Sequence, residues 1–257
     1  YEPMISIIGG VPVNVPVDRK NFHPDMDAIR SSITDRTRMI MVNSPCNPTG
    51  AVYTREEIEE IVSIAIEHDL WIISDEIYSR LIWNGGEHVS PATIEGGKER
   101  TIVISGWSKT WAMTGMRVGF LAGPEQAVRA AVKCQANSAS HIPTFMMEAA
   151  RVALDCDDHV ERFSDAYRHR RNLIVQGLED IPGLRIVNPE GAFYLFIDVT
   201  GTGMSDVQFA DGALKAGVQL IPASLITGGE GFIRVSYAAS EEDIKEGINR
   251  LRSWLLE

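Results

Sequence analysis

A linker of eleven residues, 106–116, separates two short apolar segments that have the composition of β-strands, 101–105 and 117–123. A crossover between parallel neighbours needs about a dozen residues or more and usually contains a helix. The linker GWSKTWAMTGM has a glycine near each end and leaves no room for a packed helix. We therefore expect the strand that begins at Arg117 to run antiparallel to segment 101–105, which places Arg117 and Lys109 at the same edge of a sheet.

The rest of the first part of the chain alternates strand-like and helical patterns. Segments 38–43 and 70–74 are short and apolar, as buried strands are. Between them the sequence TREE begins at Thr54, and Glu57 three residues later completes a capping-box signature. Apolar residues then recur at helical spacing, namely Ile58, Ile61, Val62, Ala65 and Ile66. A further helix is expected from Pro124. This alternation predicts an α/β fold with a mostly parallel sheet and one antiparallel strand.

The second part of the chain has a different pattern. We expect a long charged helix over about 157–179 and two more helices, near 205–216 and from about Ser240. Strand-like sequences, AFYLFIDV and GFIRVSYA, lie among these helices. The pattern predicts a small C-terminal α+β domain, residues 156–257, after a first domain, residues 1–155.

Charge and composition exclude several kinds of partner. The formal net charge is −11 and the pI is about 5.1, so we expect no nucleic-acid partner. No apolar run reaches the ~18 residues that a membrane helix needs, so we expect no membrane partner. The cysteines and histidines show no metal-ligand spacing, and no metal site is expected. Cysteines that lie far apart also favour a reducing compartment, which predicts a cytoplasmic protein.

Polar side chains with complementary chemistry follow three of the expected strands. Asn47 follows segment 38–43, Asp75 ends segment 70–74, and Lys109 follows segment 101–105. Ligands of open parallel sheets bind at the carboxyl ends of the strands. Two cations at such an edge suit a phosphate. A lysine that is crowded by a second cation and shielded from water favours its neutral form and can attack a carbonyl. An aldehyde cofactor that carries a phosphate would use both features, and a carboxylate would keep its pyridinium nitrogen protonated.

Four motifs in order resemble a known family: NPTG at 47–50, SDEIY at 74–78, SGWSKTWAMTGMRVG at 105–119 and GFIRVSYA at 231–238. Together they resemble the class I and II pyridoxal-phosphate-dependent aminotransferases, which have fold type I and include aspartate aminotransferase. The resemblance covers essentially the whole chain. It implies that residues 1–155 form part of the large cofactor-binding domain. It also implies a pyridoxal 5'-phosphate cofactor, amino acid and 2-oxo acid substrates, and a homodimer.

The resemblance assigns three residues to the cofactor. Lys109 resembles the Schiff-base lysine, which forms an aldimine with the cofactor and moves the proton at the substrate α-carbon. Asp75 resembles the partner of the pyridine nitrogen. Arg117 resembles a ligand of the phosphate group.

The resemblance assigns three further residues to the ring and the substrate. Asn47 and Tyr78 resemble the donors to the phenolate oxygen of the cofactor ring. Arg234 resembles the arginine that binds the substrate α-carboxylate, and Asn47 is a second substrate-binding candidate. The Asn47–Pro48 peptide bond is expected to be cis. Tyr194 and Phe193 are expected to belong to the core rather than to the site.

The sequence departs from the family pattern in two places. Gly106 stands where many members have a serine that binds the phosphate, and Ser108 is a candidate to replace it. The usual N-terminal segment, which completes the site, is also not seen before Tyr1. One interpretation is that the 257 residues are an incomplete fragment, inactive by themselves.

Three functions share these motifs. The leading interpretation is a transaminase that moves an amino group between an L-amino acid and a 2-oxo acid. A C–S lyase that catalyses β-elimination would carry the same residues. The aminotransferase-like, cofactor-sensing domain of a transcription regulator is the third alternative.

Overall fold

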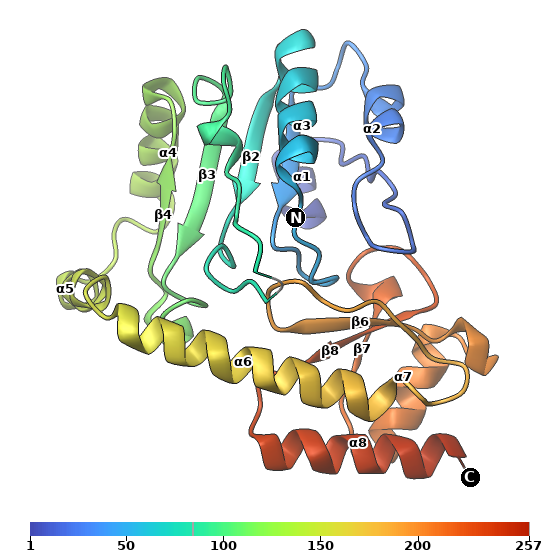
Figure 1. The fold of residues 1–257 in the computed structure, drawn as a ribbon. Helices are drawn as coiled ribbons and strands as arrows, with labels where there is room; N and C mark the ends of the chain where they lie inside the picture. The colour runs from blue at the N-terminus through green and yellow to red at the C-terminus, as the bar shows by residue number, and fades with distance from the viewer. Residues whose placement is uncertain (84, 257) are drawn as a thin grey trace.

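The structure, a computed structural model, describes residues 1–83 and 85–256, and two four-stranded sheets organise the chain (Figure 1). The first sheet has the order β1-β2-β3-β4, with β1 (Met39–Asn43), β2 (Trp71–Asp75), β3 (Thr101–Gly106) and β4 (Gly119–Ala122). The second has the order β5-β6-β8-β7, with β5 (Arg185–Ile186), β6 (Tyr194–Asp198), β7 (Ile221–Pro222) and β8 (Phe232–Ser236).

The pairing in the first sheet follows the prediction from the linker length. β1 and β2 are parallel, β2 and β3 are parallel, and β3 pairs with β4 in the antiparallel sense. Arg117 itself does not belong to the strand, because β4 begins two residues later at Gly119. Arg117 ends the short 3₁₀ turn Thr114–Met116 and has a left-handed backbone with φ 55°. The prediction that Arg117 begins the strand was therefore wrong by two residues, while the antiparallel direction is confirmed.

Gly106 is required for the close approach of β3 and β4. A Cβ atom at this position would lie 2.7 Å from the Val118 carbonyl oxygen and 2.8 Å from Gly119 Cα. Both are backbone atoms, so neither can rotate away. The backbone crossing therefore explains why a serine cannot occupy position 106 without a shift of the strands.

We expect Gly106→Ala to destabilise the protein by about 1–3 kcal/mol, the usual cost of overpacking. Gly115→Ala is the matched control, because a Cβ there meets nothing within 4 Å. Urea unfolding of both variants measures the difference. Equal unfolding midpoints for the two variants would contradict the steric explanation.

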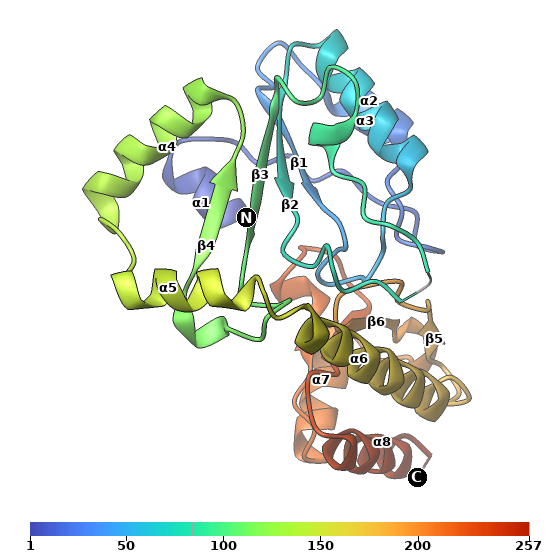
Figure 2. The same ribbon diagram turned by 60° about the vertical axis from the view of Figure 1, so that its left-hand side comes forward.

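Helices lie on both sides of the first sheet; those on one side bury apolar side chains, while those on the other side bury none. Figure 2 shows α2 (Met26–Ser32) and α3 (Arg55–Glu67) on one side of the strands, with α1 (Glu2–Ile7) and α4 (Glu125–Ser138) on the other. The capping box at the start of α3 is present, with Thr54 and Glu57 each bonding the backbone of the other. The apolar face of α3 packs on the sheet in one cluster with Val42 and Ile72. Each such buried side chain contributes about 1.5–3 kcal/mol.

The second sheet is covered by α6 (Asp157–Leu178), α7 (Asp206–Lys215) and α8 (Glu241–Leu256). Its core also includes Tyr78, Leu81 and Trp83, which come from the first part of the chain. The Trp83 indole donates a hydrogen bond to the Tyr237 hydroxyl at 3.0 Å. The segment that follows β2 is therefore part of the core of the second sheet, and a domain boundary between residues 155 and 156 stays a prediction.

α5 (Thr144–Ala153) lies between α4 and α6 and completes the helices. Among the described residues, no helix is both long enough and apolar enough to cross a membrane.

Candidate active site

Asp75 is the last residue of β2, and three contacts fix its position. Its Oδ1 accepts a hydrogen bond from the Ile77 backbone N–H at 3.1 Å. Its carbonyl oxygen accepts one from Asn43 Nδ2 at 3.1 Å. The hydroxyl of Tyr1 donates to Asp75 Oδ2 at 2.7 Å. The carboxylate is thus held at the carboxyl end of the sheet, where ligands of such sheets bind.

Lys109 lies in the turn after β3, close to two aromatic rings. Its Nζ is 5.6 Å from the centre of the Phe193 ring and 6.0 Å from that of Tyr78. Burial lowers the pKa of Lys109, and the positive charges of Arg117 and Arg234 lower it further, while Asp75 acts in the opposite direction. Both main causes favour the neutral amine, which is the form that can attack a carbonyl.

Arg234 reaches the site from β8 of the second sheet. Its Nη1 donates to Asn47 Oδ1 at 3.0 Å, and its guanidinium lies 4.8 Å from the centre of the Tyr194 ring. Asn47 is held in turn by the bond from its backbone N–H to Asn43 Oδ1 at 2.9 Å. The Asn47–Pro48 bond is cis, as predicted, and so is Ser44–Pro45.

Tyr78 and Tyr194 form a buried hydroxyl pair beside these cations. Their oxygens are 3.2 Å apart. Burial raises the pKa of Tyr78, and the neighbouring Tyr194 raises it further, so its hydroxyl keeps its proton. Phe193 and Tyr194 are buried in the core, as predicted, but they also contact Lys109 and Arg234. The apolar sequence around these two residues predicts only a core position and gives no sign of their contacts with Lys109 and Arg234.

Glu76 is a second neighbour that the sequence analysis missed. Its carboxylate is buried and accepts hydrogen bonds from Ser74 Oγ at 2.9 Å and Ser90 Oγ at 2.5 Å. His88 Nε2 lies 3.0 Å from its other oxygen. Burial raises the pKa of Glu76, but the contacts with His88, Ser90 and Ser74 lower it overall. Glu76 thus connects the end of β2, next to Asp75, to the segment that contains His88 and Ser90.

Three cations face this site without a carboxylate partner. In the part of the chain that the structure describes, no carboxylate oxygen lies within 4.0 Å of Lys109 Nζ or of the guanidinium groups of Arg117 and Arg234. The Arg117 guanidinium donates to the Thr114 carbonyl oxygen at 3.2 Å. The protein has a net charge of −11, yet these three cations lie close enough for Arg117 and Arg234 to lower the pKa of Lys109. Such a local positive charge favours the binding of anionic ligands.

These residues fit pyridoxal phosphate and an amino acid. An arginine offers several donors to a phosphate or to a carboxylate. A neutral lysine amine suits an aldehyde, and a fixed carboxylate suits a pyridine nitrogen. Ser108 lies half-buried directly before Lys109 and is close to the same turn. The residues assigned from the sequence come from the ends of the first sheet and from β8 of the second and lie near one another, namely Asn47, Asp75, Tyr78, Lys109, Arg117 and Arg234.

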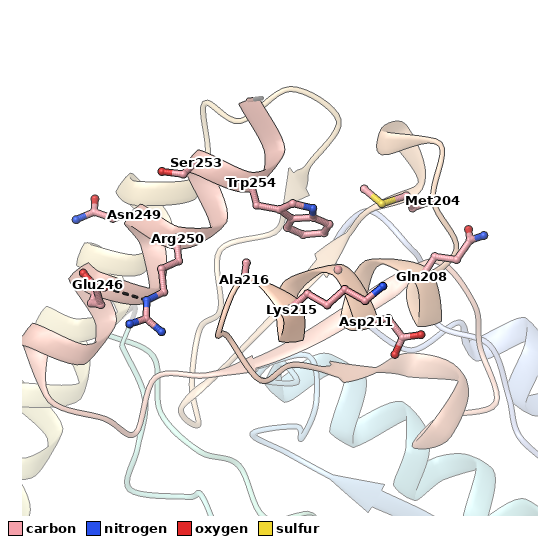
Figure 3. Close-up of a pocket in the computed structure, with 11 residues that line it drawn as sticks. Met204, Gln208, Asp211, Lys215, Ala216, Glu246, Asn249, Arg250, Ser253 and Trp254 are labelled. Atoms are coloured by element: carbon pink, nitrogen blue, oxygen red, sulfur yellow. Dashed lines mark hydrogen bonds and ion pairs between the residues drawn. The ribbon is translucent and has the colours of Figure 1, made fainter.

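A surface groove of about 890 Å³ lies elsewhere, between α7 and α8 (Figure 3). Trp254 and Met204 lie at one end of it, and Lys215 projects from α7. Arg250 Nε donates to Glu246 Oε1 at 2.9 Å, so these two charges neutralise each other. None of the described residues that line this groove belongs to the four motifs, and we place the candidate active site at the sheet edge instead.

Comparisons with known proteins agree with this geometry. A profile of the family described as Aminotransferase class I and II matches residues 1–251. The chain is 41% identical over 263 residues to aromatic-amino-acid aminotransferase 2 of Thermococcus litoralis. It is 39% identical over 263 residues to aspartate aminotransferase of Pyrococcus abyssi. Each alignment covers 100% of this chain and 67% of the relative, so the chain spans about two thirds of the length of these proteins.

Solved structures share the fold. Aromatic aminotransferase from Pyrococcus horikoshii OT3 superposes with a TM-score of 0.96 at 40% identity, over 100% of this chain and 70% of that one. Aspartate aminotransferase from Thermus thermophilus with maleate gives a TM-score of 0.93 at 37% identity, over 99% and 67%. The lyase and transcription-regulator alternatives gain no support from these relatives. The chain therefore belongs to the class I and II aminotransferases, and it is a pyridoxal-phosphate-dependent transaminase.

Proposed function

We propose that this protein transfers the amino group of an acidic or aromatic L-amino acid to a 2-oxo acid. The names of the relatives, which include aspartate and aromatic-amino-acid aminotransferases, support this range of substrates. The observation that carries the proposal is the group of three cations without carboxylate partners beside Asp75 and Tyr78. Arg117 suits the cofactor phosphate, and Arg234 suits the substrate carboxylate. Lys109 suits covalent attachment to the cofactor aldehyde.

Three residues would hold the cofactor. Bound pyridoxal phosphate supplies an aldehyde and a ring that accepts electrons from the substrate α-carbon. Lys109 would hold it covalently through its amine and then move the proton at the substrate α-carbon. The Asp75 carboxylate, whose Oδ2 accepts a hydrogen bond from the Tyr1 hydroxyl, would accept a hydrogen bond from the ring nitrogen and keep that nitrogen protonated. Arg117 would bind the phosphate, so that the cofactor stays bound while the bond to Lys109 is exchanged.

Three residues would orient the ring and the substrate. The Asn47 amide and the Tyr78 hydroxyl would donate to the phenolate oxygen of the ring. The Arg234 guanidinium would form a bidentate pair with the substrate α-carboxylate. Its bond to Asn47 already fixes its direction.

Product analysis tests the proposed reaction. We expect the holoenzyme to form glutamate from 2-oxoglutarate when L-aspartate or an aromatic amino acid is the donor. Release of ammonia and pyruvate from cystathionine, without amino transfer, would contradict the proposal. Comparing the donors by kcat/KM identifies the preferred side chain.

We further propose that the protein acts as a homodimer in the cytoplasm. The three cysteines are free, which is typical of a reducing compartment. Light scattering during size-exclusion chromatography of the holoenzyme measures the assembly. The mass of a single chain would contradict the dimer.

A further inference from the structure

The side chain of His23 lies between two carboxylates, at a distance from the cofactor residues in the sequence. Its Nδ1 is 2.8 Å and 2.9 Å from the two oxygens of Glu57. Its Nε2 is 3.5 Å from Glu190 Oε2. The His23 side chain is only 14% exposed, so water screens these contacts weakly. The arrangement favours an imidazolium with one carboxylate at each nitrogen.

The two carboxylates belong to different parts of the fold. Glu57 is the third residue of α3 and completes its capping box. Glu190 lies just before β6, and its Oε2 also accepts a hydrogen bond from the Val52 backbone N–H at 3.0 Å. His23 therefore connects the start of α3 to the segment that enters the second sheet.

Glu190 fastens the loop that carries Asn47. The backbone N–H groups of Glu190 and Gly191 both donate to the Gly50 carbonyl oxygen at 2.9 Å. A Cβ atom at Gly50 would lie 2.5 Å from Pro189 Cβ, so the two segments are in direct contact. The fastened loop is the one in which Asn47 accepts the hydrogen bond of Arg234.

We propose that protonated His23 is a positioning residue that, through Glu190 and the loop 44–52, fixes the Asn47–Arg234 pair. The inference rests on the proposed function, in which this pair binds the substrate carboxylate. His23 does not touch the substrate in this account. Its removal should therefore weaken substrate binding much more than the chemical step.

The charge on His23 gives the inference a pH dependence. Hydrogen bonds with Glu190 and Glu57 raise the pKa of His23 to about 9, against the opposing effect of burial. Tyr53 faces the imidazole from the loop, with ring centres 6.2 Å apart, and Asn21 bonds the His23 backbone from its own segment. A folded-state pKa above the ordinary 6.5 means that the contribution is complete below pH 6.5. It is lost as the pH rises through about 9.

The kinetic test compares His23→Gln with the wild-type holoenzyme across this pH range. For the wild type, KM for the amino acid should rise as the pH passes through about 9. His23→Gln should show a KM that is about 2- to 30-fold higher near neutral pH, the range for residues that act through neighbours. Its kcat should change little, and its KM should no longer show the rise near pH 9. His68→Gln is the matched control, because His68 is an exposed histidine at the other end of α3.

Two measurements do not depend on turnover. Titration of the dissociation constant for maleate, an unreactive dicarboxylate, should show the same loss of affinity in His23→Gln. Nuclear magnetic resonance should show a histidine that titrates near 9 in the wild type, is missing in His23→Gln and shifts toward 6.5 in Glu190→Gln. If His23→Gln fails to fold, Glu190→Gln replaces it as the test variant, because it should also raise the KM for the amino acid.

The outcomes separate this inference from the proposed function. An active enzyme whose KM and maleate affinity are unchanged in His23→Gln and Glu190→Gln would overturn the positioning role alone. Equal losses in kcat and in the folded fraction would also overturn it, because they indicate a structural role only. A wild-type holoenzyme that does not transaminate would refute the proposed function, whatever the titration of His23 shows.

Discussion

Lys109→Ala should lose about 10⁴-fold or more of kcat, because one side chain supplies both the covalent attachment and the proton transfer. The variant should still bind pyridoxal phosphate without a covalent bond, since Arg117 and Asp75 remain in place. Stopped-flow or end-point assays with the best donor measure kcat, and dialysis separates bound from free cofactor.

Lys133→Ala is the control for the Lys109 variant. Lys133 lies on the exposed surface of α4, outside the four motifs. It should retain wild-type turnover. Substantial transamination by Lys109→Ala would show that another group moves the proton at the substrate α-carbon.

Arg234→Lys should lower kcat/KM for acidic and aromatic donors alike. The loss should correspond to about 2–4 kcal/mol of transition-state stabilisation, the range for breaking a buried charged pair. A lysine keeps the charge but lacks the planar fork that pairs with a carboxylate. The substitution would also remove the hydrogen bond to Asn47 Oδ1 and the stacking of the guanidinium on the Tyr194 ring. Steady-state kinetics with two donors of different side chain measure the effect.

Arg250→Lys is the matched control for Arg234→Lys. Arg250 lies in α8, where it pairs with Glu246 on the surface. Its replacement should leave kcat/KM unchanged. A loss at Arg234→Lys for one donor only would mean that Arg234 recognises a side chain rather than the shared α-carboxylate.

The direction of the strands could be predicted because it depends on a length. Residues 106–116 cannot form a packed crossover, so the sequence itself fixes β4 as antiparallel to β3. The turn before β4 could not be predicted to the residue. Arg117 takes a left-handed backbone, which non-glycine residues adopt rarely, and no local signal marks it.

The site residues could be assigned because each lies in one of the four motifs, and most of them follow the end of a strand, while Arg234 lies within β8. Their neighbours could not, because their roles depend on tertiary contacts. Tyr1 meets Asp75 across 74 positions of sequence, and His23 meets Glu190 across an even larger separation. The burial of Glu76 could not be predicted, because a carboxylate directly after a strand is usually exposed and nothing in the local sequence marks it as buried. A buried charge with several partners becomes visible only when the fold is known.

The side chains of Phe193 and Tyr194 show a further limit of sequence patterns. Both lie in a continuous apolar segment, which correctly predicts a buried strand. The pattern does not say which buried rings also face a lysine or an arginine. Here that information comes from the pairing of β6 with β8, which places Phe196 opposite Arg234 and brings the Tyr194 ring beneath its guanidinium.

Reduction of the wild-type holoenzyme with borohydride, followed by peptide mapping, tests the central claim that Lys109 holds the cofactor. The lowered pKa of Lys109 and its place between Tyr78 and Phe193 make it the amine that should react. We expect pyridoxal phosphate on a single peptide that contains Lys109. Cofactor on a peptide that contains any other lysine would contradict the account.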